Sequence, residues 1–174
     1  MNTLRKILVP INFSEDSANG LKYAVSLAQE TQAELIALHV TQKKEADSFL
    51  ELLAVMEGWS MLNRPAIPVD HLLRERALDL YRFIEKVARN PGQLKIRRKV
   101  ALGNEDEKIL GVAREESIDL VVLPIRKTAF FPYLTARGKL LKMISKFPCP
   151  VILNPSFGKS WPTSSEIWRS IFAP

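Results

Sequence analysis

Four short apolar runs along the chain have the pattern of β-strands that are buried on both faces. Each run is continuous rather than alternating, as in the strands of parallel sheets. The runs occupy residues 6–11 (KILVPI), 34–40 (ELIALHV), 120–123 (LVVL) and 150–154 (PVILN). A fifth run, QLKIRRKVAL at residues 93–102, alternates apolar with basic side chains and therefore predicts an exposed or edge strand.

Apolar residues with helical spacing separate these runs. The first stripe follows Ser14 and Ser17, either of which could cap the helix, and it comprises Leu21, Ala24, Val25 and Ala28. A longer helix is predicted over residues 70–89, and its inward residues are Leu73, Ala77, Leu80, Ile84 and Val87. Asn104 and Glu107 form a capping pair for a further helix.

Residues 44–68 interrupt this alternation and are predicted to be an inserted helical segment. Large apolar residues recur at helical spacing within 47–62, namely Phe49, Leu52, Leu53 and Met56. Two prolines in RPAIPVD then end the pattern. Helix 47–62 is more apolar than a solvent-facing helix, so it either covers part of the core or forms a contact with a partner protein.

The alternation of strands and helices predicts an α/β fold with a doubly wound sheet of five strands, formed by residues 1–155 as a single domain. In such folds, ligands bind beyond the carboxyl ends of the strands, at the point where the strand order reverses. Two loops are expected to meet there. They are Pro10–Phe13 after the first strand and Pro124–Arg137 after the fourth.

Residues 156–174 lie outside this scheme and form a C-terminal extension with a short amphipathic helix. Thr163 and Glu166 make a capping box, and the apolar face behind it comprises Ile167, Trp168, Ile171 and Phe172. The helix is too short to be stable alone. The tail 161–172 is therefore expected to pack on its own domain, on a second subunit or on another protein.

The composition is that of a globular domain, with 174 residues, 47% hydrophobic and 25% charged. The net charge is +6, but we interpret the basic residues as solvated surface, so a nucleic-acid partner is not favoured. No apolar run reaches the roughly 18 residues of a membrane span, and the N-terminus lacks a signal-type stretch. The only cysteine, Cys149, cannot form an internal disulfide. These features predict a soluble cytoplasmic protein without membrane association.

Several blocks of the sequence resemble the universal stress protein (UspA) family, and they occur in the family's order. They are KILVPINFSEDSANGLKYAVSLAQETQAELIALHV, VALGNEDEKILGVAREESIDLVVLP and FPCPVILNP, and together they cover most of residues 5–155. The resemblance implies an adenine-nucleotide alpha-hydrolase-like fold with a parallel five-stranded sheet. It also implies a homodimer paired through the last strand, at Val151, Ile152, Leu153 and Asn154.

The ATP-binding branch of this family carries a glycine motif, G-x2-G-x9-G-[ST], after its fourth strand. When Leu123 before the loop and Pro150 after it fix the register, the motif positions fall on Pro124, Lys127, Arg137 and Gly138. All three glycines are therefore replaced. Proline has no N–H, and lysine and arginine add side chains where glycine lets backbone amides approach a phosphate. We predict a degenerate nucleotide pocket and no resident cofactor.

Other positions of the family's pocket are retained in part. By resemblance, the nucleotide-binding positions on the first two strands are Pro10, Ile11, Asn12 and Val40. Asn12 replaces an aspartate that hydrogen-bonds adenine in the family, and an amide can donate as well as accept. The loop also has basic side chains that could hold an anion in place of glycine amides, namely Arg126, Lys127, Arg137 and Lys139. ATP or AMP therefore stays possible as a ligand.

The sequence offers no catalytic residues and no metal ligands. His39 and Cys149 have no partners at a spacing typical of catalysis or metal binding, so we interpret both as structural. The favoured hypothesis is a non-enzymatic, dimeric binding or regulatory module of the stress response. One alternative is an ATP- or AMP-binding protein with a side-chain phosphate site and at most slow ATP hydrolysis. The second is a nucleic-acid binder that uses the basic strand Lys95–Lys99 and the loop.

Overall fold

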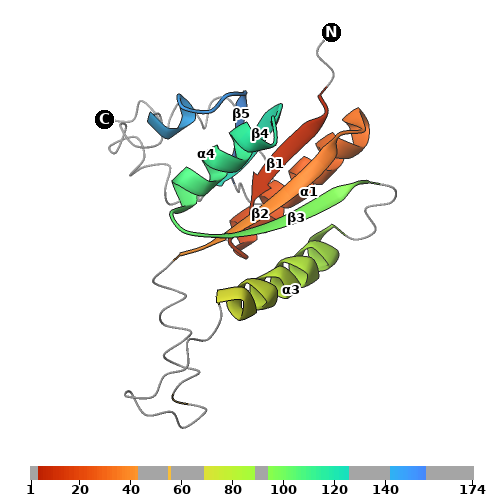
Figure 1. Ribbon diagram of the computed structural model, residues 1–174. Coiled ribbons are helices and arrows are strands. Elements are labelled where there is room, and N and C mark those ends of the chain that lie inside the picture. Colours follow the sequence, from red (N-terminus) through yellow and green to blue (C-terminus); the bar gives the residue numbers. More distant parts are fainter. Residues whose placement is uncertain (1–3, 43–54, 56–68, 89–93, 126–141, 156–174) are drawn as a thin grey trace, which may run out of the picture.

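The computed structural model describes residues 4–42, 55, 69–88, 94–125 and 142–155 (Figure 1). Within these ranges the chain forms one sheet whose paired strands are all parallel, in the order β3-β2-β1-β4-β5. The strands are β1 (Lys6–Pro10), β2 (Glu34–Thr41), β3 (Ile96–Leu102), β4 (Leu120–Ile125) and β5 (Val151–Pro155). The predicted α/β fold with five parallel strands is confirmed.

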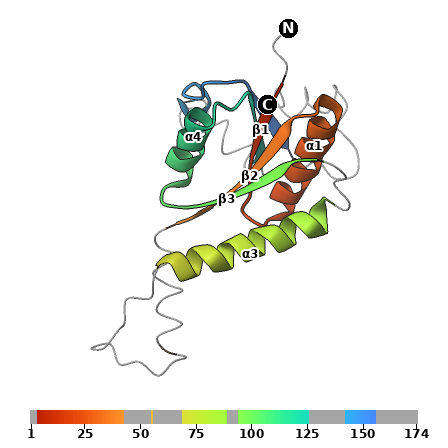
Figure 2. The same ribbon diagram turned by 45° about the vertical axis from the view of Figure 1, so that its right-hand side comes forward.

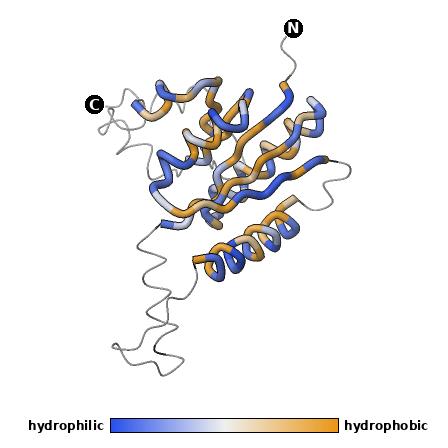
Figure 3. The backbone as a smooth tube through the Cα atoms, viewed as in Figure 1, coloured by the Kyte–Doolittle hydropathy of each residue, from blue (hydrophilic) through white to orange (hydrophobic). Residues whose placement is uncertain are grey.

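Helices cover both faces of the sheet (Figure 2). The first core cluster joins β1 and β2 to α1 (Glu15–Thr31) and α3 (Val69–Val87). The second cluster lies on the opposite face and includes α4 (Glu105–Glu115). The strands are buried on both faces in the centre of the sheet, whereas β3 at the edge has a hydrophilic stretch (Figure 3). None of the helices in the described part of the chain is long and apolar enough to cross a membrane.

The predicted helix starts are confirmed at two positions. The Ser14 hydroxyl accepts a hydrogen bond of 3.2 Å from the Ser17 amide and caps α1. The Asn104 side chain accepts one of 3.2 Å from the Glu107 amide and caps α4. Each cap satisfies a backbone donor that the helix itself cannot pair. The predicted stripe of α1 is also buried, at Leu21, Ala24, Val25 and Ala28.

The inward face of α3 was predicted only in part. Leu80 and Ile84 are buried as expected, but Leu72 is buried in place of Leu73, which is only partly buried, and Ala77 is exposed. The buried row follows i+4 steps through residues 72, 76, 80 and 84, and position 76 is an arginine. An arginine reads as polar in the sequence, although its aliphatic stem can cover apolar surface. The row was therefore not visible in the hydrophobic pattern.

The inserted segment 44–68 and the tail 156–174 lie outside the described residues, apart from the exposed Val55. The predictions for helix 47–62 and for the tail helix therefore stay predictions. After the loop that follows β4, the described chain resumes at Lys142 with a helical turn. Met143, Phe147 and Cys149 pack against the second core cluster beside β5.

Candidate functional site

The strand order reverses between β1 and β4, which are hydrogen-bonded neighbours in the middle of the sheet. The chain leaves β1 toward α1 on one face, whereas residues after β3 form α4 on the other. This reversal leaves room for a ligand beyond the carboxyl ends of the two central strands. The described residues that the sequence assigned to this site come from the ends of β1, β2 and β4, and none of them is charged. They are Pro10, Ile11, Asn12, Val40, Leu123 and Pro124.

Asn12 shapes the turn between β1 and α1. Its Oδ1 atom accepts hydrogen bonds from the Ser14 amide at 3.1 Å and from the Ser14 hydroxyl at 2.6 Å. This is an Asx turn, in which the side chain takes the place of a backbone acceptor. Because the carbonyl oxygen already accepts two hydrogen bonds, the exposed Asn12 side chain offers mainly its N–H donors to a ligand.

Phe13, which the sequence analysis did not single out, follows in a left-handed backbone conformation with φ of 62°. This region is uncommon for residues other than glycine and is an outlier for a bulky side chain. Ring contacts hold Phe13 in place. Its ring centroid lies 4.4 Å from that of His39 on β2 and 5.6 Å from that of Phe83 on α3, in an edge-to-face arrangement with the latter. The ligand end of β1 is therefore tied to β2 and α3 by aromatic packing.

His39 connects β2 to the turn after β1. Its side chain is buried, and Nδ1 lies 2.8 Å from the carbonyl oxygen of Ile11. Because a carbonyl can only accept, Nδ1 carries the proton in this contact. The amide of Ile11 in turn donates to the carbonyl of Leu38 at 2.8 Å. These two bonds extend the pairing of β1 and β2 past Pro10 and fix the turn that presents Asn12.

Pro124, which the resemblance assigns to the first glycine position of the motif, packs directly against α1. A Cβ atom added to Gly20 would lie 2.7 Å from Cγ and 3.2 Å from Cβ of Pro124. The helix therefore carries a glycine where the proline ring approaches it. Pro124 belongs to β4 and pairs in register with Asn154 of β5. Pro124 therefore has no backbone N–H to donate, and its ring has no room to move toward the helix.

The remaining predicted positions divide into those the structure places and those it does not. Ile11 and Leu123 are buried, and Val40 packs at the margin of the second core cluster. The predicted dimer strand, Val151–Asn154, is the outer strand of the sheet beside β4, and its residues are half-buried. The basic loop positions and the last glycine position lie outside the described residues, namely Arg126, Lys127, Arg137, Gly138 and Lys139.

Cys149 lies just before β5 and is partly buried. Burial raises the pKa of its thiol above the ordinary value, and the negative charge of Asp119 raises it further. A thiol with a raised pKa is a poor nucleophile at neutral pH because little thiolate is present. This agrees with the predicted packing role.

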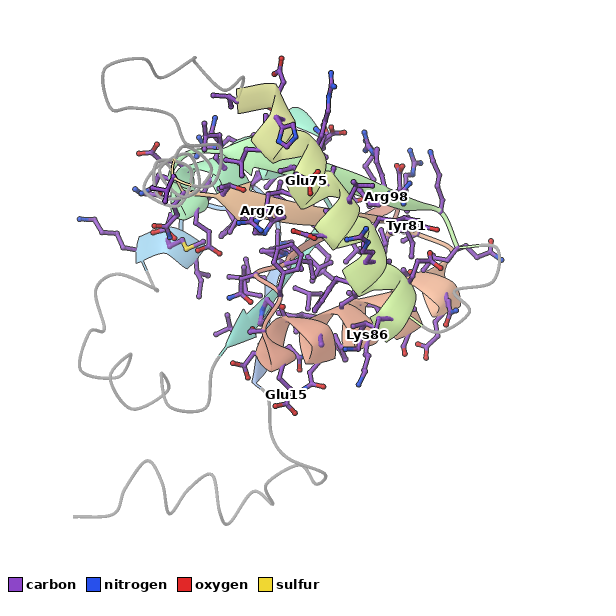
Figure 4. All side chains as sticks on the ribbon, turned by 90° about the horizontal axis from the view of Figure 1, so that it is seen from below. Glu15, Glu75, Arg76, Tyr81, Lys86 and Arg98 are labelled. Atoms are coloured by element: carbon purple, nitrogen blue, oxygen red, sulfur yellow. The ribbon has the colours of Figure 1, made fainter. Side chains whose placement is uncertain are left out.

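The basic residues of β3, together with Lys95 just before the strand, form the other candidate surface, and many of them are engaged within the molecule. Lys95 Nζ lies 3.1 Å from Glu34 Oε1, and Arg97 Nε lies 3.3 Å from the same oxygen. On the opposite face of β3, the Arg98 guanidinium lies 4.8 Å from the ring centroid of Tyr81 on α3. Figure 4 shows Arg98 and Tyr81 side by side.

Glu116, just after α4, collects three further cationic contacts. Its carboxylate accepts hydrogen bonds from Lys99 and from Arg97, the latter at 2.8 Å, and Lys6 Nζ donates to its backbone carbonyl at 2.8 Å. The hydrogen bond from Lys99, followed by that from Arg97, lowers the pKa of Glu116 below its ordinary value. The network links β1, β3 and the end of α4.

A pH-dependent loss of stability is expected from this network. Because the pKa of Glu116 is lowered in the folded state, its contribution is present above the unfolded pKa of about 4.3 and is lost as the pH falls through the folded value. Glu116→Gln should therefore lower the urea midpoint at pH 7, and the difference from the wild type should shrink below about pH 4. Glu115→Gln, one residue earlier on α4, is the control. A difference that stays constant down to pH 3 would contradict the assignment.

Comparisons with known proteins agree on one family. The family model of the universal stress proteins matches residues 3–155. Universal stress protein MJ0531 of Methanocaldococcus jannaschii is 25% identical over 153 residues, which make up 87% of this chain and 82% of the relative. The solved structure of hypothetical protein MJ0577 of the same organism has a TM-score of 0.58 at 21% identity, and the match covers 89% of this chain and 98% of the other.

A further solved structure, an Arabidopsis thaliana universal stress protein family protein with AMP bound, has a TM-score of 0.55 at 14% identity. The match covers 92% of this chain and 97% of that protein. At this identity the likeness concerns the fold alone. With the family match over residues 3–155, these findings show that the chain belongs to the universal stress protein family.

Proposed function

We propose that this universal stress protein is a non-enzymatic binding module of the stress response whose nucleotide pocket has lost its phosphate-binding end. One observation carries the proposal. Pro124, at the first glycine position of the family's phosphate motif, packs so tightly against α1 that only a glycine fits opposite it. A phosphate cradle needs backbone N–H groups and close approach, and this position supplies neither.

The adenine side of the pocket is better preserved. Asn12 is exposed at the end of β1, and its turn is fixed by Ser14 and by the pairing of Ile11 with Leu38. A ligand here would meet an amide that presents N–H donors rather than a carboxylate. Adenine has ring-nitrogen acceptors, so weak binding of an adenine ring is compatible with this arrangement, whereas strong binding of a triphosphate is not.

A nucleic-acid function is disfavoured by the partners of the basic edge strand. Lys95, Arg97 and Lys99 contact Glu34 or Glu116, and Arg98 lies on Tyr81. Binding a phosphate backbone would require these cations to exchange carboxylates for phosphates, and the net gain would be small.

Association is the proposed mode of action. The outer position of β5 and the half-burial of Val151, Ile152, Leu153 and Asn154 support the homodimer expected for the family. The dimer, the cytoplasmic location and a protein partner for helix 47–62 or the tail 161–172 stay predictions. For the dimer, the mass in solution would be twice the chain mass of 19.7 kDa.

Calorimetric titration of nucleotide-stripped protein with ATP and with AMP, in the presence of Mg²⁺, tests the proposal. We expect no measurable heat at millimolar nucleotide for the wild type. A variant that restores the family motif, with Pro124→Gly, Lys127→Gly, Arg137→Gly and Gly138→Ser, should bind ATP measurably more tightly. The gain is expected because backbone amides would again reach the phosphates.

Micromolar binding by the wild type would contradict the proposal. If that binding were lost in Arg126→Ala or Arg137→Ala, the side-chain phosphate site would be the correct alternative. If the restored variant failed to bind although it kept the thermal stability of the wild type, glycine replacement would not be the reason for the loss.

A further inference from the structure

Buried polar atoms without a hydrogen-bond partner among the described residues include one on the last residue of β2 and one on α3. These two are Oγ1 of Thr41, whose side chain is fully buried, and Nε of Arg76. Leaving such a group unsatisfied is destabilising, so native proteins rarely do so without a reason. Neither residue belongs to the positions that the family resemblance assigns to nucleotide.

Both atoms lie in the layer between the sheet and α3. Side chains of a strand alternate between its faces, and Leu35 and Ala37 belong to the core cluster that contains α3 residues. Thr41 is on the same side of β2, whereas Val40 packs with the opposite cluster. On α3, Arg76 continues the i+4 row of the buried Leu80 and Ile84.

The two residues also lie at the same end of that layer. α3 follows β2 and precedes β3, which is parallel to β2, so the helix runs against the strand direction. The N-terminal half of α3 therefore lies toward the carboxyl end of β2, where Thr41 is the last residue. Figure 4 shows Arg76 on one side of α3, toward that end of the sheet, and Tyr81 with Arg98 on the other side.

The charge around Arg76 is only partly compensated. Arg76 Nη1 donates to Asp79 Oδ2 at 3.1 Å, and Asp79 Oδ1 also lies 4.0 Å from Arg82 Nη1. One carboxylate thus serves two guanidinium groups. The Arg76 side chain is 30% exposed, so the guanidinium is partly open to solvent while its Nε is covered.

We propose that Thr41 and Arg76 form a binding site for an oxyanion, a carboxylate or a phosphate group, between the end of β2 and α3. A guanidinium N–H can only donate, so the missing partner of Nε must be an acceptor. The Thr41 hydroxyl can donate to the same group, and an oxyanion has several oxygens to accept both bonds. The site is separate from the loop after β4 and does not depend on the proposed function.

Thermal unfolding of the full chain with inorganic phosphate, with acetate and with chloride at equal ionic strength tests the site. Phosphate stabilises many proteins without binding them, so the comparison between variants decides. Thr41→Val keeps the shape and removes the hydroxyl, and Arg76→Gln removes the charge. Arg82→Gln is the matched control, because Arg82 shares Asp79 but its side chain is 74% exposed.

We expect the wild type and Arg82→Gln to show the same rise in Tm with at least one of the two oxyanions. In Thr41→Val and Arg76→Gln, the rise in Tm with the oxyanion should be no larger than the rise with chloride. This loss corresponds to oxyanion binding that is at least about tenfold weaker. Phosphate effective without acetate would assign a phosphate ligand, and the reverse a carboxylate ligand.

Equal responses in all four proteins would overturn the proposal. So would a Thr41→Val variant that is more stable than the wild type at every anion concentration, since the hydroxyl would then be an unsatisfied group that no ligand uses. If Arg76→Gln does not fold, Thr41→Val and Arg76→Lys carry the same comparison, because lysine keeps the charge but lacks the Nε donor.

Discussion

Replacing Gly20 by alanine is expected to lower the free energy of unfolding by about 1–3 kcal/mol, although alanine is the better helix former. The added Cβ would lie 2.7 Å from Cγ of Pro124, a separation at which the atoms must shift. The proline ring cannot rotate away as a flexible side chain would, so α1 and β4 must move apart. Chemical denaturation of the two proteins measures the loss.

A double-mutant cycle separates the contact from the helix itself. Pro124→Ala should relieve the clash, so Gly20→Ala should cost less in that background than in the wild type. Gly111→Ala is the control, because Gly111 lies in α4 and its nearest contact for a Cβ, Glu115 Oε1, is at 3.8 Å. That substitution should stabilise the protein by up to about 1 kcal/mol. If Gly20→Ala lowered the free energy of unfolding equally in both backgrounds, the contact with Pro124 would not be the cause of the loss.

Leu80→Ala should destabilise the domain by about 2–5 kcal/mol, because it removes a fully buried side chain from the contact between α3 and the sheet. Leu78→Ala, two residues earlier on the same helix, should change stability by no more than about 0.5 kcal/mol, since Leu78 is 49% exposed. Urea unfolding of both variants measures the two changes in the free energy of unfolding. A larger loss from Leu78→Ala would mean that α3 presents a different face to the sheet.

Much of the fold could be predicted because the buried strands are continuous apolar runs. The runs at β1, β2, β4 and β5 each correspond to a strand within two residues at either end, and the alternating run 93–102 contains β3, which begins at Ile96. Caps were also predictable, since Ser14 and Asn104 act on residues three positions away. Signals of this kind are local, so a single sequence contains them.

The parts of the site that escaped prediction depend on contacts between distant segments. Nothing in the sequence around Pro124 indicates that Gly20 lies opposite its ring, since the two are brought together only by the packing of α1 on β4. The left-handed backbone of Phe13 is held by His39 and Phe83, from two other elements. The inward row of α3 was not fully predicted, because the charged Arg76 interrupts its hydrophobic pattern.

The pairing of the β3 cations with Glu34 and Glu116 also bears on where the net positive charge of the protein lies along the chain. Six of the chain's 25 Lys and Arg lie between β4 and β5, a stretch without a single Asp or Glu, and the other 19 are matched by the 19 Asp and Glu elsewhere. The whole net charge of +6 therefore belongs to this one connection. The basic edge strand β3, in contrast, adds little to the net charge, because its cations are matched by carboxylates.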